Sequence, residues 1–285
     1  MIKLGQHNHL TILRFTDHGA YVDGGEIGEI LLPKAYVRDE MRPGDEVDVF
    51  VYLDQQERLV ATMEQPLAQV GDFAYLEVSW VNQYGAFLDW GLMKDLFVPF
   101  SEQKKTMEQG YSYIIYIYVD DATKRIVGTA KVNRYILPAP RKDYYRGKTV
   151  DLLVWQKTEY GLKVIVDNKY AGLIYNDELQ TYAASQQHDV PRTGDRLQGT
   201  VVTVRDDGRL DISLQRLGKG RFRDFADQLL DELEAAGGFL AYTDKSDADA
   251  IAERFGVSKK TFKRAVGTLY KARRITLESD GIRIF

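Results

Sequence analysis

The stretch "YGAFLDWG", residues 84–91, places a tyrosine and a phenylalanine on either side of a Gly-Ala pair, with an aspartate shortly after. The phrase "HGAYVDGG" at residues 18–25 has the same form, and "YGLKVIVD" at residues 160–167 begins a third copy. The first two copies align without a gap at a constant offset of 66 residues, so that "VDVFVYLD" (47–54) matches "YIIYIYVD" (113–120). Repetition of this kind indicates homologous domains, and we expect three of them.

The spacing after the repeated glycine is also kept. Gly19 precedes Pro33 by 14 residues, and Gly161 precedes Tyr175 by the same step. After Tyr175 the third copy carries a longer segment, "QTYAASQQHDVPRTGD", which we expect to be a loop.

Each copy contains short runs of β-branched and aromatic residues separated by glycine-bearing turns, a pattern typical of strands. In the second copy, a short helix or turn, "FSEQKKTMEQG", stands between the third and fourth expected strands, and the strands span 73–81, 85–90, 95–99, 111–120 and 124–132. Five strands in about 60 residues suit a small closed barrel, and the OB-fold is the five-stranded barrel of this size.

The pattern changes from period two to period 3.6 at Phe222. A first helix is predicted from the apolar stripe of Phe222, Phe225, Leu229 and Leu233. A second helix, "SDADAIAERFG", has Ser246 or Asp247 as N-cap and Gly256 as C-cap.

A third helix, "VSKKTFKRAVGTLYKARR", is capped by Ser258 and has an apolar face formed by Phe262, Ala265, Val266, Leu269 and Tyr270. The end of the chain, "ITLESDGIRIF", reads as a β-hairpin that turns at residues 279–281. This order of helices and hairpin predicts a winged helix. The predicted fold is therefore mainly β with an α+β tail: three tandem five-stranded OB-fold barrels (1–66, 67–138 and 139–218) followed by a winged-helix domain (219–285).

The composition narrows the class of protein. The 285 residues contain no cysteine, which excludes disulfides and thiolate metal sites. No apolar run approaches the ~18 residues of a membrane span, and the N-terminus does not resemble a signal peptide. We expect a cytoplasmic monomer that does not contact membranes.

Charge changes along the chain, although the net charge is only −4. Residues 1–70 hold 6 basic and 12 acidic residues, whereas residues 141–220 hold 13 basic and 11 acidic residues. The acidic first domain should repel phosphates, so it is the domain in which a protein partner is the alternative to nucleic acid.

The third predicted helix of the tail is the most basic segment. Eight lysines and arginines and no acidic residue lie between Arg254 and Arg274. At 100° per residue, Lys260, Arg264 and Lys271 lie opposite the apolar stripe, on the face that a helix-turn-helix presents to nucleic acid. Arg283 on the wing could add a phosphate contact, and a merely solvated basic face is the alternative.

Taken together, the motifs resemble the S-one RNA-binding domain of ribosomal-protein type. The order is aromatic-Gly-Ala-aromatic-Val, then Gly-Leu-Ile, then Gly-Asp, then a segment like "TVVTVRDDGRLDISLQR" in the third copy. In that family two aromatics around the glycine, a histidine after the third strand, and an aspartate and arginine near the fifth strand contact the nucleic acid.

Carried over to the third copy, the resemblance implies Tyr160, Lys163 in place of the second aromatic, Tyr175 in place of the histidine, Asp206 and Arg209. In the second copy it implies Tyr84, Phe87, Asp120 and Arg125, and in the first His18, Tyr21, Asp54 and Arg58. Pro99 and Pro33 stand at the histidine position of these two copies. Tyr21 and Phe87 also suit a barrel core, and that alternative stays open.

Over the whole chain, the order of three such barrels and a winged helix resembles the bacterial conserved virulence factor B family. The resemblance implies a protein that binds single-stranded RNA and regulates gene expression after transcription. Two alternatives remain: a winged-helix transcription regulator that binds DNA, and an adaptor whose barrels bind protein.

Enzymatic readings have little support. The segment "RGKT" (146–149) lacks the glycine that a phosphate-binding loop needs at position 142. His7 and His9 would need further ligands to hold a metal, and the pair Asp206-Asp207 stands where a turn is expected. We therefore expect no catalytic residue, no metal site and no cofactor.

Overall fold

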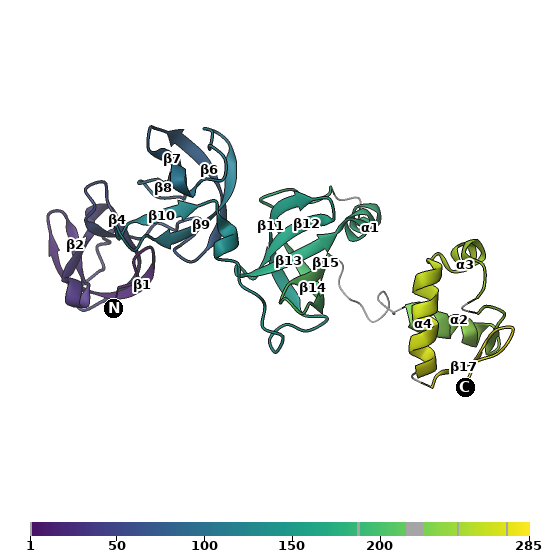
Figure 1. Ribbon diagram of the computed structural model, residues 1–285. Helices are drawn as coiled ribbons and strands as arrows, with labels where there is room; N and C mark the ends of the chain where they lie inside the picture. Colours follow the sequence, from purple (N-terminus) through teal and green to yellow (C-terminus); the bar gives the residue numbers. More distant parts are fainter. Residues whose placement is uncertain (1, 187–188, 215–224, 244, 272) are drawn as a thin grey trace. The chain divides into compact units, whose positions relative to one another are not determined.

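The computed structural model describes residues 2–186, 189–214, 225–243, 245–271 and 273–285. The chain divides into two compact units, residues 1–215 and 216–285. The first unit contains three closed five-stranded barrels, and the second contains helices and a three-stranded sheet (Figure 1). The predicted fold class is confirmed.

All three barrels have one strand order, in which the third strand pairs with the fifth in parallel and the other neighbours are antiparallel. The first barrel consists of β1 (Gln6–Thr16), β2 (Gly19–Asp23), β3 (Glu29–Pro33), β4 (Glu46–Leu53) and β5 (Leu59–Thr62). The second consists of β6 (Phe73–Val81), β7 (Gly85–Leu88), β8 (Leu96–Pro99), β9 (Ser112–Val119) and β10 (Ile126–Thr129). Each strand predicted in the second copy is present, and the short helix after β8 is a 3₁₀ turn, Phe100–Glu102.

The third barrel consists of β11 (Thr149–Thr158), β12 (Gly161–Val166), β13 (Tyr170–Tyr175), β14 (Arg196–Val204) and β15 (Leu210–Ser213). The loop predicted after Tyr175 is wrong in part, because helix α1 (Asn176–Gln186) occupies its first half. Leu179 of this helix is buried in the barrel core, and Glu178 accepts a hydrogen bond from Ser213 Oγ at 2.6 Å. The helix lacks a clear apolar stripe, so these tertiary contacts stabilise it more than its own sequence does.

The glycine of the repeated phrase is needed for a close approach of two strands. It opens the second strand of each barrel and pairs with the last residue of the third strand: Gly19 with Pro33, Gly85 with Pro99 and Gly161 with Tyr175. A Cβ at Gly161 would lie 1.9 Å from the carbonyl oxygen of Ile174. The backbone at Gly161 also has a φ of +145°, which other residues rarely adopt. The recurring glycine is therefore a requirement of the barrel itself.

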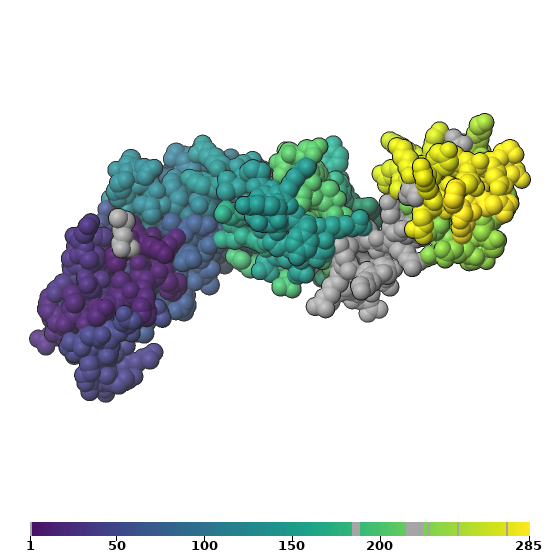
Figure 2. All heavy atoms as spheres, turned by 90° about the horizontal axis from the view of Figure 1, so that it is seen from below, coloured from purple at the N-terminus to yellow at the C-terminus, as the bar shows by residue number. Residues whose placement is uncertain are grey.

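The barrels share buried cores with their neighbours. Phe50 of the first barrel is fully buried in the cluster that fills the second barrel, with its ring 5.7 Å from that of Trp90. Phe73 of the second barrel is buried in one cluster with Leu153 and Ile165 of the third. In the space-filling view the first barrel, purple, lies directly against the second, blue to teal (Figure 2).

The second unit is a winged helix made of α2 (Phe225–Ala235), β16 (Phe239–Leu240), α3 (Ala248–Phe255), α4 (Lys259–Lys271), β17 (Ile275–Leu277) and β18 (Ile282–Ile284). Asp247 caps α3 by accepting hydrogen bonds from two backbone N–H groups, and Gly256 ends the helix in the left-handed conformation, as predicted. Ser258 Oγ accepts a hydrogen bond from Thr261 N at the start of α4. Strand β16 was not predicted, and Phe222 lies outside the described residues.

Neither a membrane-spanning helix nor a cluster of metal ligands is present in the described part of the chain. No helix in it is long and apolar enough to span a membrane. The same residues contain no group of three or more His, Asp or Glu side chains arranged to hold a metal ion.

Gly161→Ala should lower the melting temperature of the first unit by about 5 °C or more, because the new Cβ collides with the Ile174 carbonyl. Gly147→Ala is the matched control, since Gly147 also has a positive φ, +92°, but no atom within 4 Å of its Cβ position. Gly147→Ala should lower the free energy of unfolding only by the backbone strain, about 1 kcal/mol. Equal losses in a thermal melt of the two variants would contradict the role given to the close strand approach.

Candidate nucleic-acid interface

One position on each barrel carries a pair of side chains that face each other across the first two strands. In the first barrel Arg14 pairs with Tyr21, in the second Trp80 pairs with Phe87, and in the third Gln156 pairs with Lys163. Each pair follows a register shift in the first strand, which shows that the three sites are structurally equivalent. Tyr21, Phe87 and Lys163, all identified from the sequence, therefore lie at one shared position.

The second barrel presents the most aromatic of these sites. The rings of Trp80 and Phe87 are parallel, with centroids 3.7 Å apart, and Phe97 contacts Phe87 at 5.0 Å. Phe87 is half-buried, whereas 43% of Trp80 is exposed. Trp80 Nε1 donates a hydrogen bond to Asp95 at 2.9 Å, which fixes the indole. The ring available for stacking is consequently Trp80, a residue that the sequence analysis missed.

A period-two reading of β6 against β7 would have indicated Trp80, because its side chain belongs opposite Phe87 on the same face. The resemblance carried over only residues near the repeated glycine, and Trp80 lies before it in the chain.

Tyr84 and Tyr160 precede the repeated glycine in the second and third barrels. Their side chains are 64% and 66% exposed, so neither is a core residue. Their backbone carbonyls accept hydrogen bonds from Phe100 N and Asn176 N, which anchors each turn while the ring remains in solvent. Both tyrosines are thus exposed rings on well-anchored backbone.

Tyr175, 40% exposed, lies beside an arginine other than the one expected. Its hydroxyl accepts a hydrogen bond from Arg205 Nη2 at 2.5 Å, and the guanidinium lies 5.7 Å from the ring centroid. Asp211 accepts a further bond from Arg205 Nε at 2.8 Å. Arg209 instead pairs with Asp207 at 3.2 Å.

The turn between the fourth and fifth strands explains this difference. In each barrel one backbone N–H–to–carbonyl bond closes the turn: Asp54 to Arg58, Asp120 to Arg125, and Arg205 to Arg209. Arg205 therefore occupies the place of the two aspartates, and Asp206 lies one residue later, paired with Arg141. The structure does not bring Asp206 and Arg209 together.

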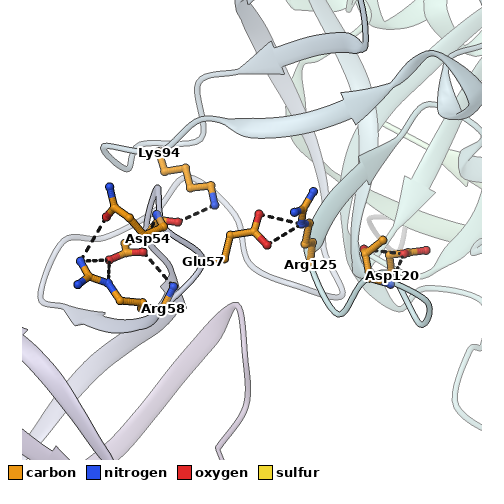
Figure 3. Close-up of polar contacts among 8 residues, drawn as sticks. Asp54, Glu57, Arg58, Lys94, Asp120 and Arg125 are labelled. Carbon is orange, nitrogen blue, oxygen red and sulfur yellow. Dashed lines mark hydrogen bonds and ion pairs between the residues drawn. The ribbon is translucent and has the colours of Figure 1, made fainter.

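The same turns in the first two barrels meet at the junction between these barrels. Figure 3 shows Glu57 facing Arg125 across the junction, with 2.7 Å between Oε1 and Nε. Lys94 Nζ donates to the carbonyl oxygen of Asp54 at 2.8 Å, and partial burial lowers the pKa of Lys94. Asp54 also pairs with Arg58 at 2.7 Å. Arg125 and Arg58 are thus already occupied by carboxylates.

A hollow with a volume of about 400 Å³ opens beside this junction. Trp80, Phe87 and Phe97 line it from the second barrel, and Tyr52 and Glu57 line it from the first. The aromatic face of the second barrel is therefore open to a ligand, with the first barrel as one wall.

The equivalent site of the first barrel is covered by its own side chains. The Arg14 guanidinium lies 4.2 Å from the Tyr21 ring centroid and pairs with Glu29 at 2.6 Å. Asp54 and Arg58 are paired as well. His18, which the resemblance also implied, is exposed.

In the winged helix, α4 buries Phe262, Ala265, Val266 and Leu269, as predicted. The prediction for Tyr270 is wrong: 53% of it is exposed, because it follows Leu269 by 100° and leaves the apolar stripe. Lys260, Arg264 and Lys271 are all exposed, and α4 has no acidic residue in its first turn. Arg283 on the wing pairs with Glu278 at 2.6 Å, and this hydrogen bond raises the pKa of Arg283.

Two family models match separate parts of the chain. A family model described as an S1 domain matches residues 4–64, and one described as a CvfB-like winged helix domain matches residues 227–284. The chain is 26% identical to a Streptococcus pneumoniae multidomain protein with nucleic acid binding domains, which has a crystal structure. The alignment covers 99% of this chain and 98% of that chain, and the TM-score is 0.41.

Two curated relatives match over most of the chain. Conserved virulence factor B of Staphylococcus saprophyticus is 26% identical, with 86% of this chain and 82% of that protein covered. The Bacillus subtilis (strain 168) protein YitL is 31% identical over 286 residues, with 98% of this chain and 92% of that protein covered. With its S1-type barrel, its CvfB-like winged helix and these full-length relatives, the chain belongs to the conserved virulence factor B family.

Proposed function

We propose that this protein binds single-stranded RNA through the second and third barrels, with α4 of the winged helix as a further contact. The observation that carries the proposal is the set of exposed aromatic rings on these two barrels: Tyr84 and Tyr160 at equivalent positions, Trp80 on the second barrel and Tyr175 on the third. Unpaired bases stack on such rings, and each stacked base contributes about 1–3 kcal/mol.

The aromatic rings favour single strands over duplexes. In a duplex the base faces are stacked on each other and cannot reach a protein ring, whereas a single strand offers them freely. The cation Lys163 lies exposed in the same barrel as Tyr160 and Tyr175, where it can attract the phosphates. Stacking and charge together are the usual means of binding a single strand without strict sequence preference.

The winged helix supports a second candidate, a contact with duplex DNA. Lys259 and Lys260 stand at the N-terminus of α4, where basic side chains oppose the helix dipole and weaken the helix. A phosphate bound there would offset this cost. The recognition helix of a helix-turn-helix binds in the major groove of DNA with its N-terminal residues near the bases. Affinity for duplex DNA therefore distinguishes a DNA-binding protein from one that binds single-stranded RNA.

We infer that the protein regulates gene expression after transcription. We also infer that it binds RNA and is not an enzyme. The carboxylates that could serve as paired catalytic groups have structural partners: Asp120 accepts from Thr123, and Asp206 pairs with Arg141. RNA incubated with stoichiometric protein and magnesium should therefore stay full length.

The test of the function is the affinity of the intact chain for single-stranded RNA, single-stranded DNA and duplex DNA at two salt concentrations. Tighter binding of single strands at both concentrations is the expected result. Preference for the duplex would favour the transcription-regulator reading, and no binding of any nucleic acid would leave the adaptor reading.

Tyr160→Ala and Tyr84→Ala should each weaken binding of a short unstructured RNA roughly 5- to 150-fold, with little dependence on salt, because each removes a stacked base. The matched controls are Tyr145→Ala and Tyr111→Ala, which remove equally exposed tyrosines outside the site. Affinity and melting temperature are measured on the same samples. A lower melting temperature with normal binding by the folded fraction would contradict the stacking role.

Lys260→Ala, Arg264→Ala and Lys271→Ala should each lower the slope of log K against log salt by roughly 0.7 on single-stranded RNA. Lys245→Ala is the control, because Lys245 is an exposed cation of the same unit that precedes α3. Unchanged slopes in all three α4 variants would show that this face is only solvated.

A further inference from the structure

Two lysines from neighbouring barrels lie against one tryptophan ring. Lys104, between β8 and β9, places its Nζ 5.3 Å from the ring centroid of Trp155. Lys163, on β12, places its Nζ 5.5 Å from the same centroid. Trp155 lies on β11 at the register shift between Val154 and Gln156. A single indole of the third barrel is thus approached by one cation from each barrel.

The packed junction between the barrels holds this arrangement. Phe73 of the second barrel shares a buried cluster with Leu153 of the third, and Trp155 packs against that cluster. The Asn168 side chain accepts a hydrogen bond from Phe73 N at 2.8 Å and donates one to Asp72 at 2.7 Å. The two barrels that carry the lysines are therefore joined by buried apolar contacts and hydrogen bonds between them.

The two positive charges lack a compensating carboxylate. Among the ion pairs of the described residues none includes Lys104 or Lys163, whereas Arg125, Arg205 and Arg209 all have acidic partners. Partial burial and the nearby Lys163 charge lower the pKa of Lys104. Attraction to the indole face stabilises each ammonium by roughly 0.5–2 kcal/mol but leaves their mutual repulsion in place.

We propose that Lys104 and Lys163 together hold one phosphodiester group of a single strand that passes from the second barrel to the third. This inference rests on the proposed RNA-binding function and adds to it a defined contact at the barrel junction. An anion between the ammonium groups would remove the repulsion, and a lysine ammonium is a compact charge suited to phosphate. The exposed ring of Tyr160 in the same barrel favours a nucleic acid over an acidic polypeptide.

The salt slope tests the proposal, because it counts the phosphates that are neutralised and not the lysines that neutralise them. Binding of a twelve-nucleotide oligouridylate to the intact chain is measured across a salt series for Lys104→Gln, Lys163→Gln and the double variant. Lys105→Gln and Lys157→Gln are matched controls, since both lysines are exposed: Lys105 lies next to Lys104 between β8 and β9, and Lys157 lies on β11, the strand that pairs with β12.

If one phosphate is shared, each single variant lowers the slope by up to roughly 0.7 and the double variant lowers it by roughly 0.7 in total. A loss of roughly 1.4 in the double variant would show two separate phosphates and overturn the proposal. The proposal would also be overturned if the Lys104 and Lys163 variants behaved like the controls while the unaltered chain bound RNA. That result would leave the proposed function intact. Absence of RNA binding by the unaltered chain would instead remove the function and the inference together.

Acylation of lysines, followed by mass spectrometry, provides an independent readout. The lowered pKa of Lys104 should make it react faster than Lys105 in the free protein. Bound oligouridylate, or the oligothymidylate of the same length, should protect Lys104 and Lys163 but not Lys105 or Lys157. Protection by polyglutamate and not by either oligonucleotide would assign the site to an acidic polypeptide and contradict the proposal.

Discussion

The buried contacts between neighbouring barrels determine where every candidate binding residue of the first unit lies. Phe50 fills part of the second barrel's core, and Phe73 is buried together with Leu153 and Ile165 of the third. Burying a phenylalanine contributes roughly 1.5–3 kcal/mol, so each junction is stabilised by apolar burial as a core is. Separating the barrels would expose these side chains to water. The exposed rings and cations of the second and third barrels therefore belong to one folded unit.

The repeated phrase serves the fold first and the binding face second. Its glycine permits the close approach of two strands in all three barrels, whereas the residues around it differ: Arg14 covers Tyr21, Trp80 stacks on Phe87, and Lys163 replaces an aromatic residue. The S1-domain model matches residues 4–64, a barrel whose own face is covered, so a match to the fold does not require an open face. The glycine that the barrel requires is thus distinct from the candidate binding residues around it.

Most of the fold followed from local patterns. Strand runs, the period of the tail helices and the caps at Asp247 and Ser258 depend on neighbouring residues, so the sequence alone indicates them. Helix α1 could not be predicted in this way, because a core contact of Leu179 stabilises it. Tyr270 is exposed because the buried face of α4 is narrower than the set of five residues that the sequence analysis assigned to it.

The site was harder to predict than the fold, because its contacts join distant segments. Trp80 becomes an exposed ring beside Phe87 only after β6 pairs with β7, and Arg205 reaches Tyr175 only after the barrel closes. Glu57 occupies Arg125 across a barrel junction, which no spacing within one repeat reveals. The exposure of Tyr84 and Tyr160 follows from their place next to a glycine whose position in the barrel is fixed, and their role in binding stays a prediction.

Ultraviolet cross-linking of the intact chain to a uridine-rich single-stranded RNA, followed by mass spectrometry of the linked peptides, tests the central claim most directly. RNA binding by the second and third barrels predicts cross-links on peptides that contain Trp80 or Tyr84 and on peptides that contain Tyr160 or Tyr175. Cross-links confined to the first barrel or to the winged helix would contradict it.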